Sequence, residues 1–245
     1  MPFDSLVVNQ SDAKLSYIDS GAPSMQSPYT TIFAFHGLGY THAIFQKVLS
    51  IAVDKGIRFV AISRRSYPGS TPFTADELDV ILNGSNEQKS AWMEARGHET
   101  ATFINAFIEN HNLPAISDDG NSGGVVILGW SLGSYVCTTA LSNADTLPVD
   151  IRQRLGRYIR ALILQEPVPL AFGFPMPARD WTPMADNNIP VEDRYPLWRQ
   201  WMTSYFEHGD LSKRNIDLLS YIVPSTVRVP TIFNMSKAQF NDIVY

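Results

Sequence analysis

The 245-residue sequence contains a single cysteine, Cys137, and no apolar run approaching the roughly 20 residues that cross a bilayer. One thiol cannot form an internal disulfide, and it cannot build a four-ligand structural zinc site without three nearby histidines. The N-terminal residues lack the basic and then apolar segments of a secretory signal. These absences predict a cytoplasmic protein without a membrane span, and we expect no metal and no cofactor.

Positive charge is also scarce. The chain has 19 Lys and Arg against 24 Asp and Glu, a net charge of −5, and no stretch concentrates its basic residues. A surface of this kind cannot follow a phosphate backbone, so nucleic acid is not an expected partner. With 44% hydrophobic and 18% charged residues, the composition is that of a folded protein. The length fits one large core with an insertion.

Short apolar runs rich in β-branched and aromatic residues alternate with segments of helical spacing. This pattern is typical of a mainly parallel sheet with helices on both faces. It predicts an α/β fold with a doubly wound, mostly parallel sheet over residues 1–170. The expected strands are residues 30–35, 57–62, 124–128 and 158–164, preceded by a short hairpin at 6–8 and 14–18. The expected helices are residues 43–53, 87–110 and 132–143.

The character of the sequence changes after this core. Six prolines and three of the five tryptophans fall between residues 170 and 226. Helical spacing recurs at 195–206 and 211–222, so residues 171–226 are predicted to form a helical lid insertion. Residues 227–245 are then a tail or a partial strand of the core, with a strand-like segment at 227–233.

The sharpest local signal is Gly129-Trp130-Ser131-Leu132-Gly133, which follows an apolar strand and precedes a helix of small residues. A serine on a tight strand-to-helix turn has its hydroxyl pushed outward, and the small glycines let neighbouring segments pass closely. The alternative is a glycine-rich turn with a solvated serine. The flanking strand and helix favour Ser131 as a nucleophile.

A second turn follows the strand at residues 31–35, with the sequence His36-Gly37-Leu38-Gly39. Such a loop can direct a backbone N–H at a bound oxygen. We predict that the amides of Leu38 and Leu132 form an oxyanion hole. The alternative is a plain strand-end turn, in which His36 is structural.

Together these residues resemble the α/β-hydrolase fold family. The resemblance rests on His36-Gly37, on the segment from Arg64 to Ser70 after the next strand, and on the Gly129–Gly133 motif. It covers roughly residues 13–170, and it implies a lid after the sixth strand. Serine members of this family hydrolyse esters, lipids, lactones, thioesters or amides, and some are non-catalytic receptors.

The sequence departs from the family pattern in its histidines. A serine hydroxyl needs a base to take its proton, and the resemblance implies a histidine after the last strand. Only His208 follows Ser131 in the chain. It is the candidate base, but it also fits a helix C-terminus, where a cationic side chain is favoured. The other histidines, His36, His42, His98 and His111, are expected to be structural or at the surface.

The acid of a triad has two candidates. Glu166 ends the sixth strand, where some family members keep an alternative acid, and Asp242 follows the strand-like segment 227–233. Glu166 is the favoured one, and Asp242 also fits a surface charge.

These gaps predict a C-terminally incomplete fold that stops before the family's last two strands. The exposed edge of this sheet is a template for pairing with a second chain, so a homodimer is one alternative for its assembly. Two functions follow. One is a serine hydrolase of esterase, lactonase or lipase type, impaired by the missing base and acting through an acyl-enzyme on a small apolar ester or lactone. The other is a catalytically silent binding or scaffold protein.

Overall fold

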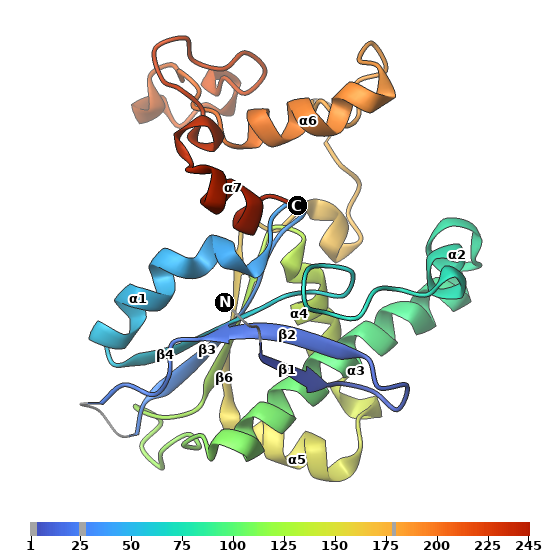
Figure 1. Ribbon diagram of the computed structural model, residues 1–245, viewed down its shortest axis with the longest axis vertical. Helices are drawn as coiled ribbons and strands as arrows, with labels where there is room; N and C mark the ends of the chain where they lie inside the picture. Colours follow the sequence, from blue (N-terminus) through green and yellow to red (C-terminus); the bar gives the residue numbers. More distant parts are fainter. Residues whose placement is uncertain (1–3, 25–27, 178–179) are drawn as a thin grey trace. The chain divides into compact units, whose positions relative to one another are not determined.

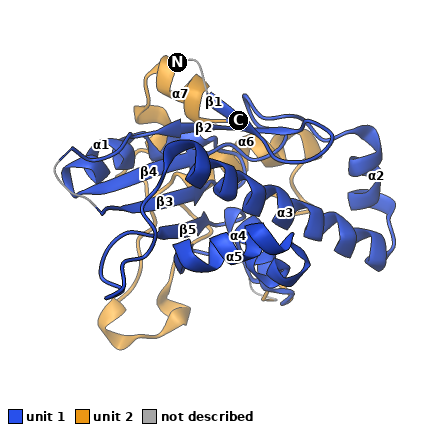
Figure 2. Ribbon diagram, turned by 90° about the horizontal axis from the view of Figure 1, so that it is seen from below, with its two compact units in different colours: residues 1–174, 245 blue, residues 175–244 orange. Residues whose placement is uncertain are grey.

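The computed structural model describes residues 4–24, 28–177 and 180–245, and these residues form two compact units. The first unit contains the residues up to Phe174 together with Tyr245 (Figure 2). The second unit is Pro175–Val244. The segment 227–244, expected as a tail or partial strand of the core, belongs to the second unit.

A six-stranded sheet forms the centre of the first unit (Figure 1). Its order is β1-β2-β4-β3-β5-β6. The first two strands of this order pair antiparallel, as do β2 and β4, and the remaining neighbours are parallel. The predicted α/β class with a mostly parallel sheet is therefore confirmed. The strands are β1 (Asp4–Val7), β2 (Lys14–Asp19), β3 (Thr30–Phe35), β4 (Ile57–Ile62), β5 (Val125–Trp130) and β6 (Ile159–Gln165).

Helices cover both faces of this sheet because its central strands are apolar on both sides. The short helix η1 (His42–Phe45) and α1 (Gln46–Asp54) lie on one face (Figure 1). On the other face lie α3 (Asn86–His111), α4 (Gly133–Ser142) and α5 (Val149–Tyr158). Successive side chains of β3 point to opposite faces of the sheet and so join the apolar core on each face. Phe33 and Phe35 pack toward α3, whereas Ala34 packs toward α1.

One further helix and two helical turns lie in the connections of the first unit. Helix α2 (Ala75–Asn83) begins at a capping box in which Thr74 and Glu77 satisfy each other's backbone amides. The turn η2 (Ala144–Thr146) links α4 to α5, and η3 (Pro169–Phe172) follows β6. Helices α2 and α5 were not predicted, although the Thr-x-x-Glu spacing at Thr74 is a recognised start signal.

A buried ionic network ties the loop after β4 to the helices. Glu99 accepts from Arg65 Nη1 at 2.7 Å and from Arg96 Nη2 at 2.9 Å, and Asn9 donates to the same oxygen at 2.8 Å. Glu77 accepts from both arginines as well. Arg65 thus has a structural role, and the network fixes one side of the loop that reaches the candidate site.

The second unit contains little regular structure. Its helices are α6 (Val191–Met202) and α7 (Lys237–Ile243), with single turns η4 (Leu211–Lys213), η5 (Ile216–Leu218) and η6 (Thr231–Asn234). The predicted helix at 211–222 is wrong, because Asp210 and Asn215 accept hydrogen bonds from the amides of Ser212 and Asp217 and so compete with a helix. The predicted strand at 227–233 is also wrong: Pro230 has no N–H to donate to a ladder, and it starts η6 instead.

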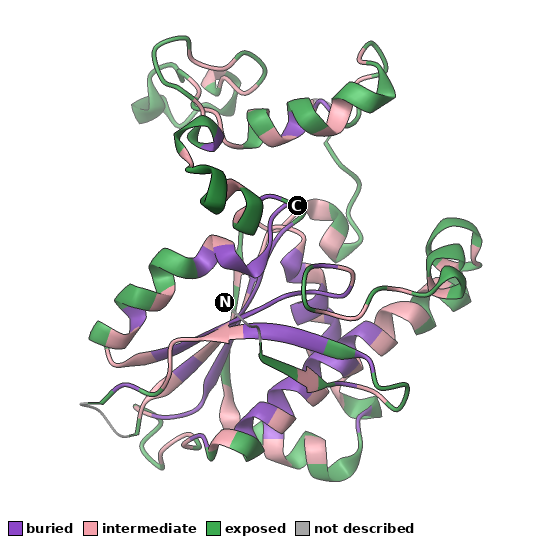
Figure 3. Ribbon diagram, in the orientation of Figure 1, coloured by how far each residue is buried: buried purple, intermediate pink, exposed green. Residues whose placement is uncertain are grey.

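Burial follows this division. The strands of the first unit are largely buried, whereas most of the second unit is exposed or intermediate (Figure 3). The edge strands β1 and β6 are exceptions within the first unit: three of the four residues of β1 are exposed, and Ile163 of β6 is 43% exposed. Among the residues that the structure describes, we find no helix long and apolar enough to span a membrane.

Candidate active site

Ser131 lies on a tight turn between β5 and α4. Its φ is 50°, in the left-handed region that residues with a Cβ atom rarely adopt. Two hydrogen bonds hold this backbone: the Ser131 N–H donates to the Gln165 carbonyl at 2.9 Å, and the Ser134 N–H donates to the Ser131 carbonyl at 3.0 Å. The strand-to-helix turn expected from the glycine motif is therefore present.

The glycines around Ser131 permit three close approaches. A Cβ at Gly129 would lie 2.6 Å from the Cα of Ser134, and a Cβ at Gly133 would overlap the carbonyl oxygen of Phe35. A Cβ at Gly37 would lie 3.1 Å from the Cβ of Ser131. The loop after β3 therefore passes directly beside the serine, and side chains at these positions would push the two segments apart.

The orientation of the Leu38 amide is fixed through the preceding carbonyl. The Gly37 carbonyl accepts from Arg64 Nη2 and from His36 Nδ1, both at 2.9 Å. Because the peptide is planar and trans, the N–H of Leu38 must point away from that carbonyl. The same reasoning applies to Leu132, since the Ser131 carbonyl of its peptide accepts from Ser134. Both amide directions are set before any ligand binds.

The Ser131 hydroxyl and both amides are open. Across the described ranges, neither the Leu38 nor the Leu132 amide donates a backbone hydrogen bond, and Ser131 Oγ has no hydrogen-bond partner. Ser131 is partly exposed, and Leu38 is 39% exposed. Three groups suited to an attacking oxygen and a developing oxyanion thus lie at the carboxyl ends of β3 and β5, and Ser131 also stands at the start of α4.

Two residues after β4 hold the loop that carries Leu38. The hydroxyl of Tyr67 accepts from the Gly39 amide at 3.3 Å and from Arg64 Nη2 at 3.2 Å. The backbone amide of Arg64 donates to His36 Nε2, so the proton of this imidazole is on Nδ1. Burial and the Arg64 charge lower the pKa of His36 well below its usual range. The expected structural role of His36 agrees with this neutral, fully bonded ring.

Tyr245, which is distant in the sequence, also holds the loop that carries Leu38. Its amide donates to the Gly39 carbonyl at 3.0 Å, and its hydroxyl donates to the Ser66 carbonyl at 2.8 Å. Its ring lies 4.6 Å from that of Tyr67. Sequence reasoning missed Arg64, Tyr67 and Tyr245 as site-building residues, because their side chains bond to backbone groups of distant segments, which no motif spacing encodes.

Glu166 lies next to this site but is already engaged. It follows β6 with a φ of 48°, and its Oε2 accepts from the indole N–H of Trp130 at 3.1 Å. The carboxylate is exposed. The structure thus places Glu166 one residue beyond the Gln165 carbonyl that anchors Ser131, at the same end of the sheet.

His208 and Asp242 both belong to the second unit. The helix α6 ends at Met202, so His208 lies beyond it in an exposed loop, and its expected position at a helix C-terminus is wrong. The helix stops because the side chains of Thr203 and Ser204 bond back to the Gln200 carbonyl. His208 Nδ1 accepts from the Ser220 amide at 3.0 Å, which puts the ring proton on Nε2. Asp242 is an exposed residue of α7.

The remaining histidines of the first unit are tied into its structure. Burial lowers the pKa of His42 to about 4, so this imidazole is neutral in the folded protein at pH 7. His98 contacts Thr146, and the tilted ring of His111 lies 4.1 Å from that of Phe107, beside Arg58. His42 is thus buried in the fold, whereas His98 and His111, both on α3, are partly exposed.

Comparisons with known proteins show the family of the chain. The model of the alpha/beta hydrolase family matches residues 32–228, and the chain belongs to that family. No curated protein matches the sequence. Among solved structures, a bromoperoxidase from Bacillus anthracis is similar at 15% identity and a TM-score of 0.48, with 88% of this chain and 64% of that chain covered.

Two further solved structures are also similar to part of the chain. A probable hydrolytic enzyme from Pseudomonas aeruginosa PAO1 is 15% identical with a TM-score of 0.44, over 84% of this chain and 54% of that one. An esterase from Exiguobacterium antarcticum is 16% identical with a TM-score of 0.41, over 68% and 45%. The chain therefore spans about half to two thirds of the length of these three proteins.

The described part of the chain contains no group of three or more His, Cys, Asp or Glu side chains that could hold a metal ion. Cys137 is fully buried on α4, and burial raises the pKa of its thiol strongly. The site itself offers a serine hydroxyl, two amides and a neighbouring carboxylate.

Proposed function

We propose that this protein is a serine hydrolase that forms an acyl-enzyme on Ser131, with a small apolar ester or lactone as substrate. The observation that carries the proposal is the left-handed Ser131 backbone beside two amides whose directions are fixed by the Gly37 and Ser131 carbonyls. An oxygen bound between Leu38 and Leu132 would receive both N–H groups as its charge develops. Losing one such donor typically costs about 10² to 10³ in rate.

The proposed base is His208, with Glu166 as the acid. The assignment of His208 sets a condition on the mechanism. His208 takes a proton from Ser131 only in a conformer in which its Nε2 is unprotonated and Nδ1 no longer accepts from Ser220. Without such assistance, a factor of roughly 10² to 10⁴ is lost. We therefore expect slow turnover, with acylation easier to observe than steady-state hydrolysis.

The apolar substrate class is supported by the aromatic character of the second unit. Trp181 and Trp201 pair edge to face at 6.1 Å, and Trp201 pairs with Phe206 at 6.0 Å. Rings of this kind can wall an apolar pocket as a lid, or simply pack on one another. The lid role of this unit is part of the proposal.

The test is acylation by p-nitrophenyl butyrate, followed by nitrophenolate release and intact mass. We expect one butyryl adduct per chain in the wild type, no adduct in Ser131→Ala, and an unchanged adduct in the matched control Ser142→Ala on the same helix. A further variant, His208→Gln, should slow acylation if His208 is the base. Equal labelling of wild type and Ser131→Ala would refute the proposal.

A second candidate function is a catalytically silent binding protein. It is favoured by the hydrogen bond that His208 Nδ1 accepts from Ser220, and by His36 and His42 being neutral and buried. In that case the ester binds without nitrophenolate release or adduct. The same experiment distinguishes the two functions.

A homodimer through the sheet edge also stays a proposal. The edge strand β6 pairs only with β5 in the described residues, and a free edge is a template for another chain. Sedimentation of the wild type against Ile163→Lys, which places a charge on this edge, tests it. A monomer at all concentrations would contradict a dimer.

A further inference from the structure

Arg64 is the one buried arginine, among the residues that the structure describes, that has no carboxylate partner. It lies two positions after β4 and is 8% exposed. None of the ion pairs between described residues includes it. The other buried arginines form the pairs Arg58 with Asp19, Arg65 with Glu77 and Glu99, and Arg96 with the same two glutamates.

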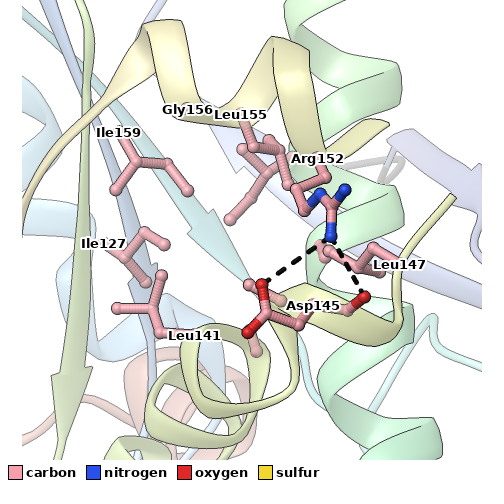
Figure 4. Close-up of a pocket in the computed structure, with 12 residues that line it drawn as sticks. Ile127, Leu141, Asp145, Leu147, Arg152, Leu155, Gly156 and Ile159 are labelled. Carbon is pink, nitrogen blue, oxygen red and sulfur yellow. Dashed lines mark hydrogen bonds and ion pairs between the residues drawn. The ribbon is translucent and has the colours of Figure 1, made fainter. Parts of the chain in front are cut away.

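Exposed arginines make this exception clearer. Arg152 Nη1 lies 3.7 Å from the Asp145 carboxylate beside an apolar pocket (Figure 4). Both of these side chains reach water, so their charges need no partner and the pair contributes little. Arg64 has little contact with water and no carboxylate. Its charge is therefore buried and unbalanced.

The neighbours of the Arg64 guanidinium are neutral. Nη2 donates to the Gly37 carbonyl at 2.9 Å and to the Tyr67 hydroxyl at 3.2 Å, and Nε is buried without a hydrogen-bond partner in the described residues. Burial, together with the Arg64 charge, lowers the pKa of His36, so this imidazole carries no charge at pH 7. Desolvation raises the pKa of the Tyr135 phenol, although Arg64 opposes this effect, so Tyr135 is neutral as well. None of these groups cancels the charge.

A structural hydrogen bond does not account for this charge. Desolvation disfavours an ion, and a buried guanidinium is ordinarily kept with a group of opposite sign. A neutral donor is enough to hold the Gly37 carbonyl, since Nδ1–H of His36 already donates to it at 2.9 Å. A negative charge that develops only during a reaction would supply the missing partner.

The Gly37–Leu38 peptide connects Arg64 to such a charge. Arg64 donates to its carbonyl, and the Leu38 N–H is the opposite end of the same planar unit. A cation at the carbonyl polarises the peptide and makes the N–H a stronger donor. Two hydrogen bonds and one peptide unit separate the guanidinium from an oxyanion held by Leu38, a distance of roughly 9 Å. At an effective dielectric constant of about 20, a unit charge there changes the rate by about 20-fold.

We propose that Arg64 is a positioning residue whose charge, acting through the Gly37–Leu38 peptide, stabilises the negative oxygen that develops during acylation of Ser131. The inference rests on the proposed function and adds to it a cation that does not touch the substrate. The acyl step then depends on the charge at position 64, and not only on a hydrogen bond from it.

The charge acts at one point of the proposed acyl step. The Ser131 oxygen bonds to the acyl carbon, and its proton passes to the proposed base, His208. The electron pair of the carbonyl bond moves onto the acyl oxygen, which Leu38 and Leu132 hold. When this pair returns, the bond to the alkoxide leaving group breaks, and that group takes the proton from the base. Arg64 gives and receives no proton, because its guanidinium stays protonated.

The field of Arg64 at the nucleophile can be measured without turnover. Ser131→Cys places a thiol there, and Cys137, the chain's one native cysteine, is fully buried. A nearby cation favours the thiolate, so adding Arg64→Gln should make the new thiol about tenfold less acidic. Adding Arg64→Lys, which keeps the charge, should change it by less than about threefold. The pH dependence of iodoacetamide alkylation measures both, and an acidity that Arg64→Gln leaves unchanged would overturn the proposal.

Acylation by p-nitrophenyl butyrate tests the same charge in the reaction. We expect Arg64→Gln to slow the acyl step by about 20-fold and Arg64→Lys by less than about threefold. Circular dichroism should show both variants folded, because the loss of Arg64 leaves no carboxylate unpaired. If Arg64 acted only through a hydrogen bond, a glutamine amide could donate to the Gly37 carbonyl as lysine does. Equal rates in the two variants would therefore contradict the role of the charge.

Arg160 provides the matched control. It donates to the Gly123 and Gly120 carbonyls at 2.9 and 2.8 Å from the opposite end of the parallel strands. Arg160→Gln should leave thiol acidity and acylation within about twofold of the parent, since the field of an exposed charge is screened by solvent.

The outcomes separate this proposal from the proposed function. A wild type that forms no butyryl adduct would remove the proposed function, and the role of Arg64 with it. An adduct that forms at the same rate in the wild type and in Arg64→Gln would overturn the role of Arg64 alone.

Discussion

The two units differ in how far they bury their apolar side chains. In the first unit Phe33, Phe103 and Phe107 are fully buried and meet edge to face with ring centroids 5.2 to 6.2 Å apart or stack at 6.1 Å. In the second unit Val191, Val227 and Phe233 are 74%, 79% and 63% exposed. Burial of apolar area is the main favourable term in folding. The first unit therefore supplies most of the stability, and the second is expected to open locally at lower free energy.

The largest expected effect comes from the core of the first unit. Phe103→Ala removes a ring with no exposed surface and should lower the free energy of unfolding by about 3 to 5 kcal/mol. The matched change Phe233→Ala in the second unit should cost less than about 0.5 kcal/mol. Urea unfolding followed by circular dichroism measures both. Equal shifts of the two midpoints would mean that the units share one core.

Buried charge is the next contrast. Glu99→Gln leaves the buried guanidiniums of Arg65 and Arg96 with one carboxylate fewer, and this should cost about 3 to 5 kcal/mol. The control Glu109→Gln breaks a more exposed pair with Arg154 and should cost about 0 to 1 kcal/mol. Chemical denaturation of both variants at pH 7 provides the measurement. A small effect at Glu99 would show that the network is not part of the stabilising structure.

The pH dependence should also originate in the first unit. Burial lowers the pKa of His42 to about 4. Between this pH and the unfolded pKa of about 6.5, the unfolded chain therefore binds a proton at His42 that the folded chain does not bind. Stability is therefore fully present above the unfolded pKa of about 6.5 and is lost as pH falls toward 4, by about 3 kcal/mol in total. His36 acts in the same direction. In His42→Gln the slope of unfolding free energy against pH should be shallower over this range, and an unchanged slope would contradict the assignment.

The smallest expected change concerns the loop beside Ser131. Tyr67→Phe keeps the ring contacts with His36 and Tyr245 but removes the oxygen that accepts from the Gly39 amide. Since misplaced catalytic groups lose rate, acylation of Ser131 should slow by about tenfold with little loss of stability. Tyr205→Phe, which removes a hydroxyl in the second unit, is the control. Equal slowing in both variants would show that the Tyr67 hydroxyl has no specific effect on the site.

The sequence predicts the first unit far better than the second. Residues 30–35 and 57–62 match β3 and β4 at both ends, because β-branched and aromatic runs bounded by turns leave little alternative. Helix α5 was missed because Gly156 and its many charges hide the packing of Leu155 against the core. In the second unit, side chains such as Asp210 and Asn215 bond to nearby amides and override the apolar spacing.

The candidate site was also only partly predictable. The positions of Ser131, Leu38 and Leu132 follow from glycine spacing next to strands, since that spacing requires sharp turns at the sheet edge. The hydrogen bond that fixes the Gly37 carbonyl does not follow from the sequence, because the register of β3 with β4 brings Arg64 to this carbonyl. The hydrogen bond of His208 to Ser220 likewise depends on the loop geometry of the second unit.

The most direct test of the central claim is the reaction of the intact protein with a fluorophosphonate, which needs both an activated serine and an oxyanion hole. The expected result is a single adduct located on Ser131 by peptide mass spectrometry, absent in Ser131→Ala. The open Leu38 and Leu132 amides should make this labelling faster than that of any other serine. No adduct on the folded wild type, or labelling that persists in Ser131→Ala, would contradict the assignment of Ser131 as nucleophile.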